Sequence, residues 1–285
     1  MSDELRVDRS VPPLAGKSAG QPAVKTSPPP ADKSAEQHTD KPAPSPDDKP
    51  VPPTPYEPRD SRSVLAQPNA DPNKPTLVDD PESGLSLVWR DQVVRADFSS
   101  MLPRLRQGPL HKELLVRAAK LKGVPHPVAV DATAGLGEDS LLLAAAGFEV
   151  TLFERDSLIA ALLRDAVLRA RDNPTLAAAA NRMHVIEGDS IAGLRNLEAS
   201  PDVVYLDPMF PARTKSAAVK KKLQVIQLLE EPCDDEAQLV EAALAVRPRK
   251  VIIKRPIKGP HLAGIKPSYS LTGKAVRYDV LVPPR

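Results

Sequence analysis

From residue 128 onward, short apolar runs alternate with longer stretches whose apolar residues recur at helical spacing. The short runs are rich in β-branched side chains, a pattern typical of buried strands. The longer stretches end at or near Gly or Pro, as helices do, and Ser157 is the expected N-cap of one of them. We expect strands at 128–131, 149–153, 183–186, 202–206 and 250–254, and helices at 138–146, 157–171, 215–229 and 234–246.

Alternating strands and helices of this length predict an α/β fold with a doubly wound, mainly parallel sheet. Two further strands, at 85–90 and 92–98, and a helix at 110–121 are expected before it. After it, the segments 265–271 and 275–281, joined by Thr272-Gly273, predict a closing hairpin.

Residues 1–81 differ from the rest of the chain in composition. They hold 18 of the 33 prolines and hardly an apolar pair. Such a segment cannot offset the entropy lost on ordering. We expect a disordered Pro-rich tail at 1–81, a small β and helical extension at 82–126 and the main domain at 127–285. A spacer or docking role for the tail is the alternative to a solvated, variable segment.

Charge divides at the same boundary. The tail has 10 Lys or Arg against 13 Asp or Glu, a net of −3, and the remainder has 29 against 24, a net of +5. A mildly basic domain is compatible with a polyanionic partner without requiring one. Cys233 is the only cysteine, which excludes an internal disulfide and a cysteine-based metal site. The absence of an apolar signal segment or membrane-length run predicts a cytoplasmic protein without membrane contact.

Four successive strands of the expected sheet end in polar residues. The first runs into Asp131-Ala-Thr-Ala-Gly135-Leu-Gly137, the second ends at Glu154, the third at Glu187-Gly-Asp189-Ser190 and the fourth at Asp207. Small residues let the backbone approach a ligand closely, and an acid ending the second strand suits ribose hydroxyls. Because parallel strands end at one edge of a sheet, the sequence predicts a nucleoside-type ligand site there.

The fourth strand belongs to Val203-Val-Tyr-Leu-Asp-Pro-Met-Phe-Pro211, an apolar run followed by an acidic, aromatic turn. Pro208 and Pro211 fix the backbone on either side of Phe210. An acid, a prolyl carbonyl and an aromatic ring at fixed spacing can grip a flat base that carries an exocyclic amine. The alternative is an ordinary Asp-Pro loop start, but the polar ends of the other strands favour a site.

The strand ends also narrow the ligand class. A dinucleotide site would need a fuller G-x-G-x-x-G, and a P-loop would need the absent Gly-Lys-Ser/Thr. Asp131 does not favour phosphate, but it can accept from the amino group of a methionine-like ligand, directly or through water. The pattern resembles a class I S-adenosylmethionine-dependent methyltransferase with a Rossmann-like sheet. Its Asp207-Pro-x-Phe210 resembles the Asp/Asn-Pro-Pro-Tyr/Phe motif of amino-group methyltransferases.

A closer resemblance, over about residues 97–282, is to the ribosomal RNA small subunit methyltransferase J family. The segments that carry it are Val130-Asp-Ala-Thr-Ala-Gly-Leu-Gly137, Leu152-Phe-Glu-Arg155, Ala160-Ala-Leu-Leu163, Val203 to Pro211, Lys215-Ser-Ala, Val219-Lys-Lys221 and Val251-Ile-Ile-Lys-Arg-Pro256. The resemblance implies methylation of the exocyclic N2 of one guanosine near the 3′ end of 16S rRNA in the small ribosomal subunit. S-adenosyl-L-methionine would be the methyl donor.

Residue roles follow from the loop pattern and this resemblance together. The expected donor-binding residues are Asp131, Gly135, Gly137, Glu138, Asp139, Glu154, Arg155, Asp189, Ser190 and Asp207. Asp207 and the Pro208 carbonyl are expected to accept the amino hydrogens, and Phe210 to stack on a base that has been unstacked. The residues expected to hold RNA phosphates are Lys215, Lys220, Lys221, Lys222, Lys254 and Arg255. For the lysines at 220–222 alone, a solvated helix face is the simpler interpretation.

The chain also differs from that family in two places. A Pro-rich tail stands where the family has a small N-terminal α/β subdomain, and Arg104-Leu-Arg-Gln-Gly-Pro109 replaces a Gly-rich loop. His111, His184 and His261 show no ligand spacing, so no metal site is expected. One alternative function is an amino-directed DNA adenine or cytosine methyltransferase, although the chain has no separate target-recognition domain. Another is a non-catalytic RNA-binding factor that keeps the fold.

Overall fold

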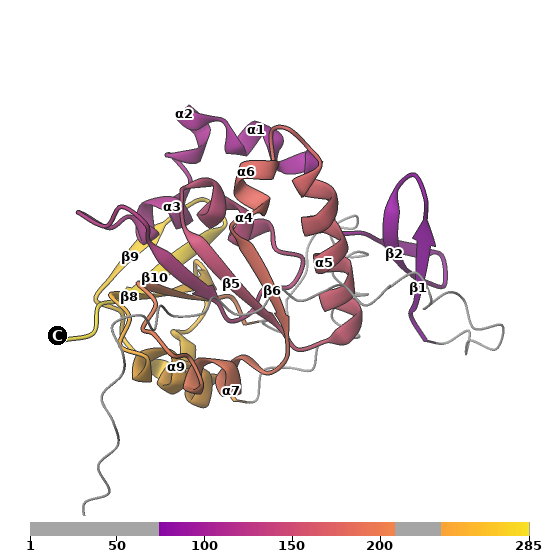
Figure 1. Cartoon of the computed structure of the whole chain (residues 1–285). Helices are drawn as coiled ribbons and strands as arrows, with labels where there is room; N and C mark the ends of the chain where they lie inside the picture. The colour runs from indigo at the N-terminus through magenta and orange to yellow at the C-terminus, as the bar shows by residue number, and fades with distance from the viewer. Residues whose placement is uncertain (1–73, 209–234, 285) are drawn as a thin grey trace, which may run out of the picture. The chain divides into compact units, whose positions relative to one another are not determined.

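The computed structural model describes residues 74–208 and 235–284. Most of the expected tail, the helix expected at 215–229 and Cys233 lie outside these residues. The described chain forms a seven-stranded sheet, a three-stranded sheet and the helices that pack against them (Figure 1). None of the helices in this part of the chain has the length and apolar character that a bilayer crossing requires.

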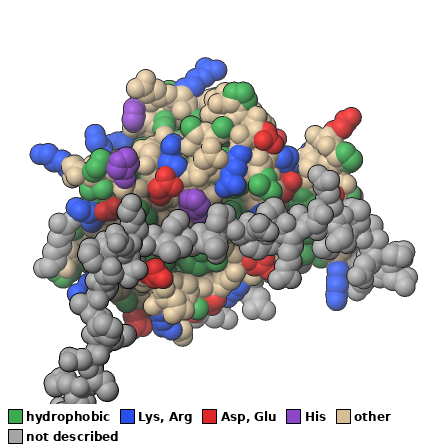
Figure 2. Space-filling view, in the orientation of Figure 1, with side chains coloured by type: hydrophobic (Ala, Val, Ile, Leu, Met, Phe, Trp, Pro, Cys, Tyr) green, Lys and Arg blue, Asp and Glu red, His purple; other side chains and the backbone are tan. Residues whose placement is uncertain are grey.

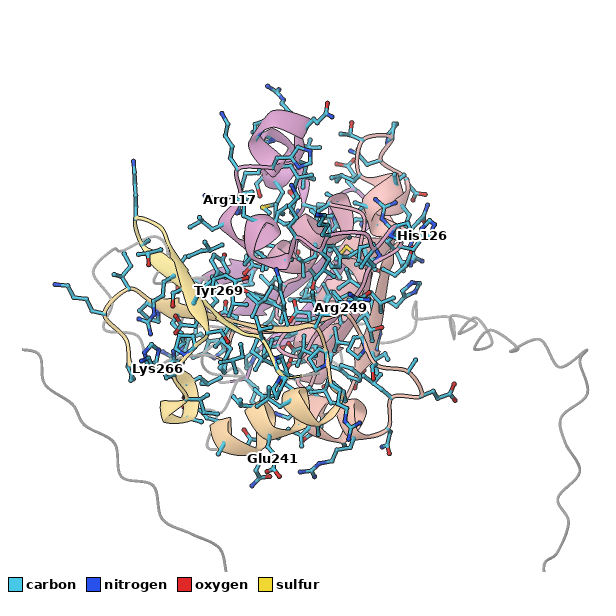
Figure 3. All side chains as sticks on the ribbon, turned by 90° about the vertical axis from the view of Figure 1, so that its left-hand side faces the viewer. Arg117, His126, Glu241, Arg249, Lys266 and Tyr269 are labelled. Carbon is cyan, nitrogen blue, oxygen red and sulfur yellow. The ribbon has the colours of Figure 1, made fainter. Side chains whose placement is uncertain are left out.

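The seven-stranded sheet has the order β6–β5–β4–β7–β8–β10–β9. Its parallel strands are β4 (Val128–Asp131), β5 (Glu149–Glu154), β6 (Met183–Glu187), β7 (Val203–Leu206) and β8 (Lys250–Pro256). The closing strands β9 (Tyr269–Thr272) and β10 (Val276–Leu281) form an antiparallel hairpin, and β10 is antiparallel to β8. Figure 3 shows this side of the sheet, with Tyr269 on the edge strand. The chain order reverses at β4, so the predicted doubly wound, mainly parallel sheet is confirmed.

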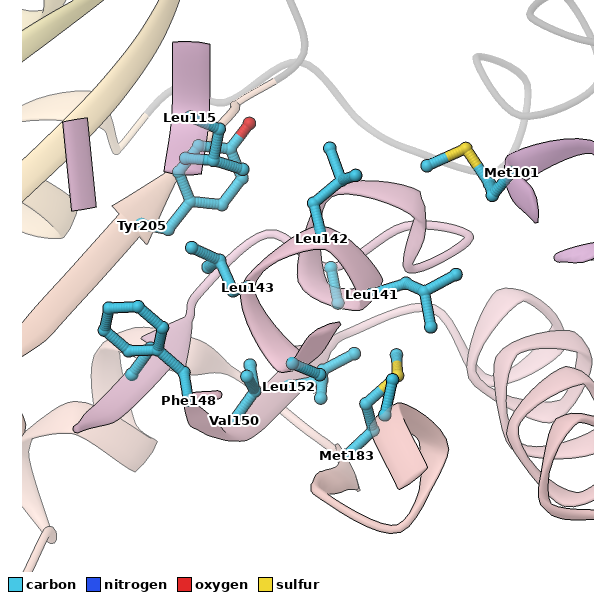
Figure 4. Packing of buried hydrophobic residues seen from close by; sticks show 14 of the residues in the cluster. Met101, Leu115, Leu141, Leu142, Leu143, Phe148, Val150, Leu152, Met183 and Tyr205 are labelled. Carbon is cyan, nitrogen blue, oxygen red and sulfur yellow. The ribbon is translucent and has the colours of Figure 1, made fainter. Parts of the chain in front are cut away.

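Strand side chains alternate between two apolar layers. In β7, Val203 and Tyr205 join one cluster, whereas Val204 and Leu206 join the other, as the two-residue period of a strand requires. The first layer is covered by α3 (Leu114–Ala119), α4 (Glu138–Ala145), α5 (Ser157–Arg171) and α6 (Ala177–Ala180). The second is covered by α7 (Ser190–Arg195), α9 (Glu236–Ala245) and the 3-10 turn η3 (Leu262–Gly264). Figure 4 shows the Tyr205 ring among aliphatic side chains of the first layer.

The three-stranded sheet consists of β1 (Thr76–Asp80), β2 (Gly84–Trp89) and β3 (Gln92–Val94), and it packs against α5. Asp165 of α5 accepts a hydrogen bond from the Leu85 N–H at 3.1 Å. β1 lies inside the segment 1–81 assigned to the tail, so that boundary is wrong. The sequence does not reveal this strand because it is short, lies between two prolines and gains its partner only by pairing with β2.

The helix expected at 110–121 is wrong in its extent. The chain instead forms η2 (Ser99–Met101), α1 (Leu102–Leu105), α2 (Gln107–Leu110) and then α3. Glu113 breaks the helical path with a ψ of 129°, and Arg104 donates to both oxygens of its carboxylate, at 2.8 and 2.9 Å. This ion pair fixes the corner between α1 and α3.

Smaller boundary differences have local causes. Asp156, rather than Ser157, caps α5, because its carboxylate accepts from the N–H groups of Leu158 and Ile159. The strand expected at 92–98 ends at Val94, and β9 begins at Tyr269 instead of residue 265. The helix α7 was not expected, since it spans little more than one turn.

Candidate active site

The carboxyl ends of the parallel strands meet at one edge of the seven-stranded sheet. Asp131 of β4 pairs in register with Tyr205 of β7, and Glu154 of β5 pairs with Glu187 of β6. Asp207 follows β7 directly, and Lys254 lies near the end of β8. The edge therefore gathers carboxylates from several strands beside one lysine.

The loop between β4 and α4 depends on two glycines with left-handed backbone angles. Gly135 has a φ of +52° and Gly137 a φ of +78°, which other residues adopt only with strain. A Cβ at Gly137 would lie 2.5 Å from Leu163 Cδ1, so this glycine also lets α4 begin close against α5. A Cβ at Gly135 would meet no heavy atom of the described chain within 4 Å. The loop is thus open to a ligand at Gly135 and tightly packed at Gly137.

Asp131 is buried, with 1% of its surface exposed. Its carboxylate accepts from the Thr133 N–H at 3.0 Å and from the Ser140 hydroxyl at 2.5 Å. Burial raises the pKa of Asp131 to about 7, although these two hydrogen bonds oppose the shift. Asp131 therefore changes charge near neutral pH at the head of the loop.

Glu154 holds the opposite side of the same loop. Its two carboxylate oxygens accept from the N–H groups of Gly135 and Asp156, each at 2.9 Å. Burial raises the pKa of Glu154, and the backbone hydrogen bonds limit the rise. A carboxylate offers about four acceptor positions, so Glu154 retains capacity for further donors such as hydroxyl groups.

The remaining expected donor-binding residues lie around this loop with more exposure. Glu138 and Arg155 are exposed. Asp189 is exposed and caps α7 by accepting from the Ala192 N–H at 3.0 Å, and Ser190 begins that helix. The structure brings these residues to the same edge as Asp131 and Glu154, with their side chains less enclosed.

Asp207 is fixed by its neighbours on both sides. Its backbone N–H donates to the Thr133 hydroxyl at 2.6 Å, which ties it to the β4–α4 loop. Its carboxylate Oδ2 lies 2.9 Å from Lys254 Nζ. The same ammonium donates to Asp139 Oδ2 at 2.6 Å, and the Tyr205 hydroxyl donates to that oxygen at 2.6 Å. The adjoining Pro208 is buried.

Charge is unevenly compensated in this cluster. Burial raises the pKa of Asp207, against the nearby Lys254 charge, which lowers it. Burial alone would lower the pKa of Lys254, but the charges of Asp139 and Asp207 outweigh it, so the pKa is raised. Burial also raises the pKa values of Tyr205 and Tyr278. Lys254 therefore stays charged, and both phenols stay neutral, across the physiological pH range.

Not every expected residue reaches this edge. Arg255 is 1% exposed and donates to the Pro260 carbonyl at 3.0 Å, on the sheet face opposite to Lys254. A joint phosphate-holding role for Lys254 and Arg255 does not fit this arrangement, because successive strand side chains point to opposite faces. The expected site residues outside the described part of the chain are Phe210, Lys215, Lys220, Lys221 and Lys222. Among the described residues, no group of His, Cys, Asp or Glu is arranged to hold a metal ion.

The sequence alone missed three contributors: Thr133, Ser140 and Tyr205. Tyr205 precedes Asp207 by two residues and so faces the same layer, a signal that strand periodicity could have given. The links from Thr133 to Asp207 and from Ser140 to Asp131 join residues from different elements. Those links depend on the packed structure.

The arrangement suits a nucleoside-like ligand beside a held carboxylate. The open loop at Gly135 and the spare acceptor capacity of Glu154 fit a ligand with ribose hydroxyls. No contact within the described residues engages Asp207 Oδ1, which can accept from an amine. The two features lie on one sheet edge and are linked through Thr133.

Comparison with known proteins places this geometry in context. Residues 64–283 match the family model described as putative SAM-dependent methyltransferase. A protein from Thioalkalivibrio sulfidiphilus named Ribosomal RNA small subunit methyltransferase J is 47% identical over 193 residues, which are 66% of this chain and 76% of that protein. A protein of the same name from Neisseria meningitidis serogroup C is 41% identical over 202 residues, 70% of this chain and 80% of that protein.

A solved structure is also similar. The SAM-dependent methyltransferase from Neisseria gonorrhoeae superposes with a TM-score of 0.61 at 32% sequence identity. The match covers 75% of this chain and 85% of that one. The likeness therefore extends over most of the seven-stranded sheet and its helices.

Proposed function

Because the chain belongs to the ribosomal RNA small subunit methyltransferase J family of SAM-dependent methyltransferases, we propose that it methylates the exocyclic N2 of a guanosine in 16S rRNA. The observation that carries this proposal is the position of Asp207 at the end of β7. Lys254 contacts its carboxylate, and its backbone N–H donates to Thr133 of the β4–α4 loop. An acceptor for amino hydrogens thus stands next to a loop suited to the methyl donor.

The donor fits the residues around that loop. S-adenosyl-L-methionine supplies an electrophilic methyl group on a sulfonium and leaves as a neutral thioether. Glu154 would accept from the ribose hydroxyls, and Gly135 would give the backbone room to approach the nucleoside. Asp131 would attract the donor's amino group, directly or through water. Glu138, Asp139, Arg155, Asp189 and Ser190 would complete the surroundings.

Asp207 would orient the acceptor amine. The N2 lone pair of guanine is partly delocalised into the ring, which weakens it as a nucleophile. When Asp207 Oδ1 and the Pro208 carbonyl accept the amino hydrogens, the lone pair is directed toward the methyl group. Formation of the N–C bond requires N2 to lose one hydrogen, and Asp207 is positioned to receive that proton. Orientation of this kind supplies much of the rate in two-reactant enzymes.

The substrate partner would be rRNA in the small ribosomal subunit, reached with the target base unstacked. Phe210 would stack on the base and add about 1–3 kcal/mol. Lys and Arg side chains are scattered over the face shown in Figure 2 and mixed with acidic ones, so phosphate contacts there would come from single basic side chains. We further propose that residues 127–285 form the catalytic domain and that the protein acts in the cytoplasm, where ribosomes assemble.

The test uses purified full-length protein, labelled S-adenosyl-L-methionine and 30S particles from a strain that lacks the enzyme. Nucleoside analysis of the digested rRNA should yield N2-methylguanosine, confined to 16S rRNA. Methyl transfer to DNA but not to 30S particles would refute the proposal and favour the amino-directed DNA enzyme. Donor binding without transfer to any nucleic acid would favour a non-catalytic RNA-binding factor.

A further inference from the structure

Lys254 is the only cation that the described chain places in direct contact with Asp207. We propose that Lys254 is a positioning residue that holds Asp207 Oδ2 and turns Oδ1 toward the acceptor amine, in place of the phosphate contact expected from sequence. The inference rests on the function proposed above. In this role, Lys254 acts in the methyl-transfer step and does not bind an RNA phosphate.

The geometry of the ammonium supports this role. Lys254 Nζ lies 2.6 Å from Asp139 Oδ2 and 2.9 Å from Asp207 Oδ2. Its side chain is only 25% exposed. If the Lys254 ammonium left these partners for an RNA phosphate, two neighbouring carboxylates would lose their counter-charge. Such a loss is costly for partly buried charges. Lys258, four residues later, is exposed and has no ion pair among the contacts of the described residues, so it serves as a surface lysine for comparison.

The ammonium also joins the two halves of the site. Asp139 belongs to the first turn of α4, directly after the donor loop, and Asp207 follows β7. Tyr205, on the same strand as Asp207, donates to the Asp139 oxygen that Lys254 also contacts. Three elements, α4, β7 and β8, are therefore held by one charged centre. Loss of the lysine charge would leave Asp139 and Asp207 to repel each other.

A shift in the ionisation of Asp207 is the signature that separates positioning from phosphate binding. The groups that face the cluster are Asp131 from β4, Asp139 from α4, Tyr205 from β7, Tyr278 from β10 and Arg104 from α1, and the charge of Arg255 acts on Asp207 from the opposite face of β8. Lys254 lowers the pKa of Asp207, and Asp139 raises it. Removal of the lysine and removal of Asp139 should therefore move the pKa of Asp207 in opposite directions.

The experiment compares wild type, Lys254→Met, Lys254→Arg and Asp139→Asn, with Lys258→Met as the matched surface control. In Lys254→Met, kcat for 30S methylation should fall at least about tenfold, because the acceptor carboxylate loses its orientation. KM for 30S particles should change less than about twofold, and Lys254→Arg should recover most of the lost kcat. The acidic limb of the kcat profile should move up by roughly 1–3 pH units, the usual effect of losing one adjacent opposite charge. Lys258→Met should match wild type.

The Asp207 carboxyl is also titrated directly by ¹³C NMR, with its resonance assigned by its loss in Asp207→Asn. This measurement needs no substrate and separates Asp207 from Asp131, which titrates near 7. The pKa should rise in Lys254→Met and fall in Asp139→Asn. If Lys254→Met does not fold, the Asp139→Asn titration and the Lys254→Arg kinetics decide.

An unchanged pKa of Asp207 in these variants, or a tenfold rise in KM with kcat preserved, would overturn the positioning role. Wild-type protein that transfers no methyl group to 30S particles would refute the proposed function alone. The NMR titration would still decide the inference about Lys254 in that case.

Discussion

Two ion clusters occupy opposite faces of the same strands, β8 and β10, and they are built in opposite ways. Lys254 and Tyr278 pair in register and face the layer of α3 and α4, where Lys254 meets Asp139 and Asp207. Arg277 pairs with Arg255 and faces the layer of α9. Strand alternation alone separates the two clusters.

In the α9-side cluster, Arg277 and Asp279 each have several hydrogen-bond partners. Arg277 donates to the carbonyls of Pro256 and Ile257, each at 2.7 Å, and to Asp279 Oδ1 at 2.9 Å. Ser270 donates to the same carboxylate at 2.6 Å, and His261 lies 3.0 Å from it. Burial alone would raise the pKa of Asp279, but these hydrogen bonds outweigh it, so the pKa is lowered. This cluster fixes the loop that follows β8.

In the site cluster, carboxylates outnumber the cation. Asp139 and Asp207 share the Lys254 ammonium, with the buried Asp131 nearby, and the pKa values of Asp131 and Asp207 are raised. Raised acid pKa values in a loop-lined edge are typical of functional sites, whereas lowered ones accompany structural pairing. The two clusters therefore differ in how far their charges are compensated, more than in how many charges they contain. Substitutions at Asp207, Arg277, Asp131 and His261 would test this contrast.

The largest effect is expected at the acceptor carboxylate. Asp207→Ala should lower kcat for 30S methylation by about 10²–10⁴-fold, the usual range for a positioned proton acceptor. Asp207→Asn keeps a carbonyl oxygen and should retain more activity. Thermal unfolding of both variants should stay close to wild type, because the Asp207 carboxylate is partly exposed and Lys254 keeps Asp139 as its partner. Full turnover by Asp207→Ala would refute the role given to this residue.

Arg277→Met should affect stability and leave the chemistry unaltered. Removing one partner of a buried ion pair typically costs about 3–5 kcal/mol, since Asp279 and several carbonyls lose their donor. Urea denaturation followed by circular dichroism would measure the loss. Arg249→Met is the matched control, because Arg249 forms an ion pair with Asp202 and its side chain is 41% exposed. The free energy of unfolding should fall by less than about 1 kcal/mol in this variant. If the pH dependence of kcat changed in Arg277→Met, this cluster would also act in catalysis, and the contrast between the two clusters would be wrong.

Asp131→Asn tests the raised pKa at the head of the loop. The folded-state pKa of about 7 exceeds the ordinary value of 3.8, so the folded protein binds this proton more tightly. The resulting stabilisation is complete below the ordinary pKa and is lost as pH rises through about 7. Relative to wild type, Asp131→Asn should therefore gain on the order of 2 kcal/mol between pH 5 and pH 8. Denaturation of both proteins at pH 5 and at pH 8 would measure this gain. If Asp131→Asn showed no such gain, the raised pKa of Asp131 would be contradicted.

The smallest effect is expected for His261→Ala. The imidazole is 41% exposed, and Asp279 keeps Arg277 and Ser270 as donors without it. One partly exposed hydrogen bond contributes about 0.5–1 kcal/mol, and denaturation should show a loss of that size. A loss as large as that of Arg277→Met would mean that the α9-side cluster is less well compensated than its contacts indicate.

Much of the sheet could be predicted from sequence because apolar periodicity is local. The five parallel strands and the polar ends of β4, β5 and β7 follow from residues within each segment. The strand Thr76–Asp80 was missed because its partner β2 supplies its stability. The pairing of Lys254 with Asp139, 115 residues earlier, was missed because it depends on where the folded chain places α4 relative to β8.

Local sequence is sufficient to place particular side chains at the ends of the strands, Asp131, Glu154 and Asp207 among them. A strand carries its alternation and its terminal residue wherever it is placed. The partners and the charge of those side chains depend on how the strands and helices pack in three dimensions. Lys254 became a partner of two carboxylates, and Arg255, one residue later, was buried on the other face. The physical reason is that electrostatic energy depends on distance and burial, and neither exists until the strands and helices pack together.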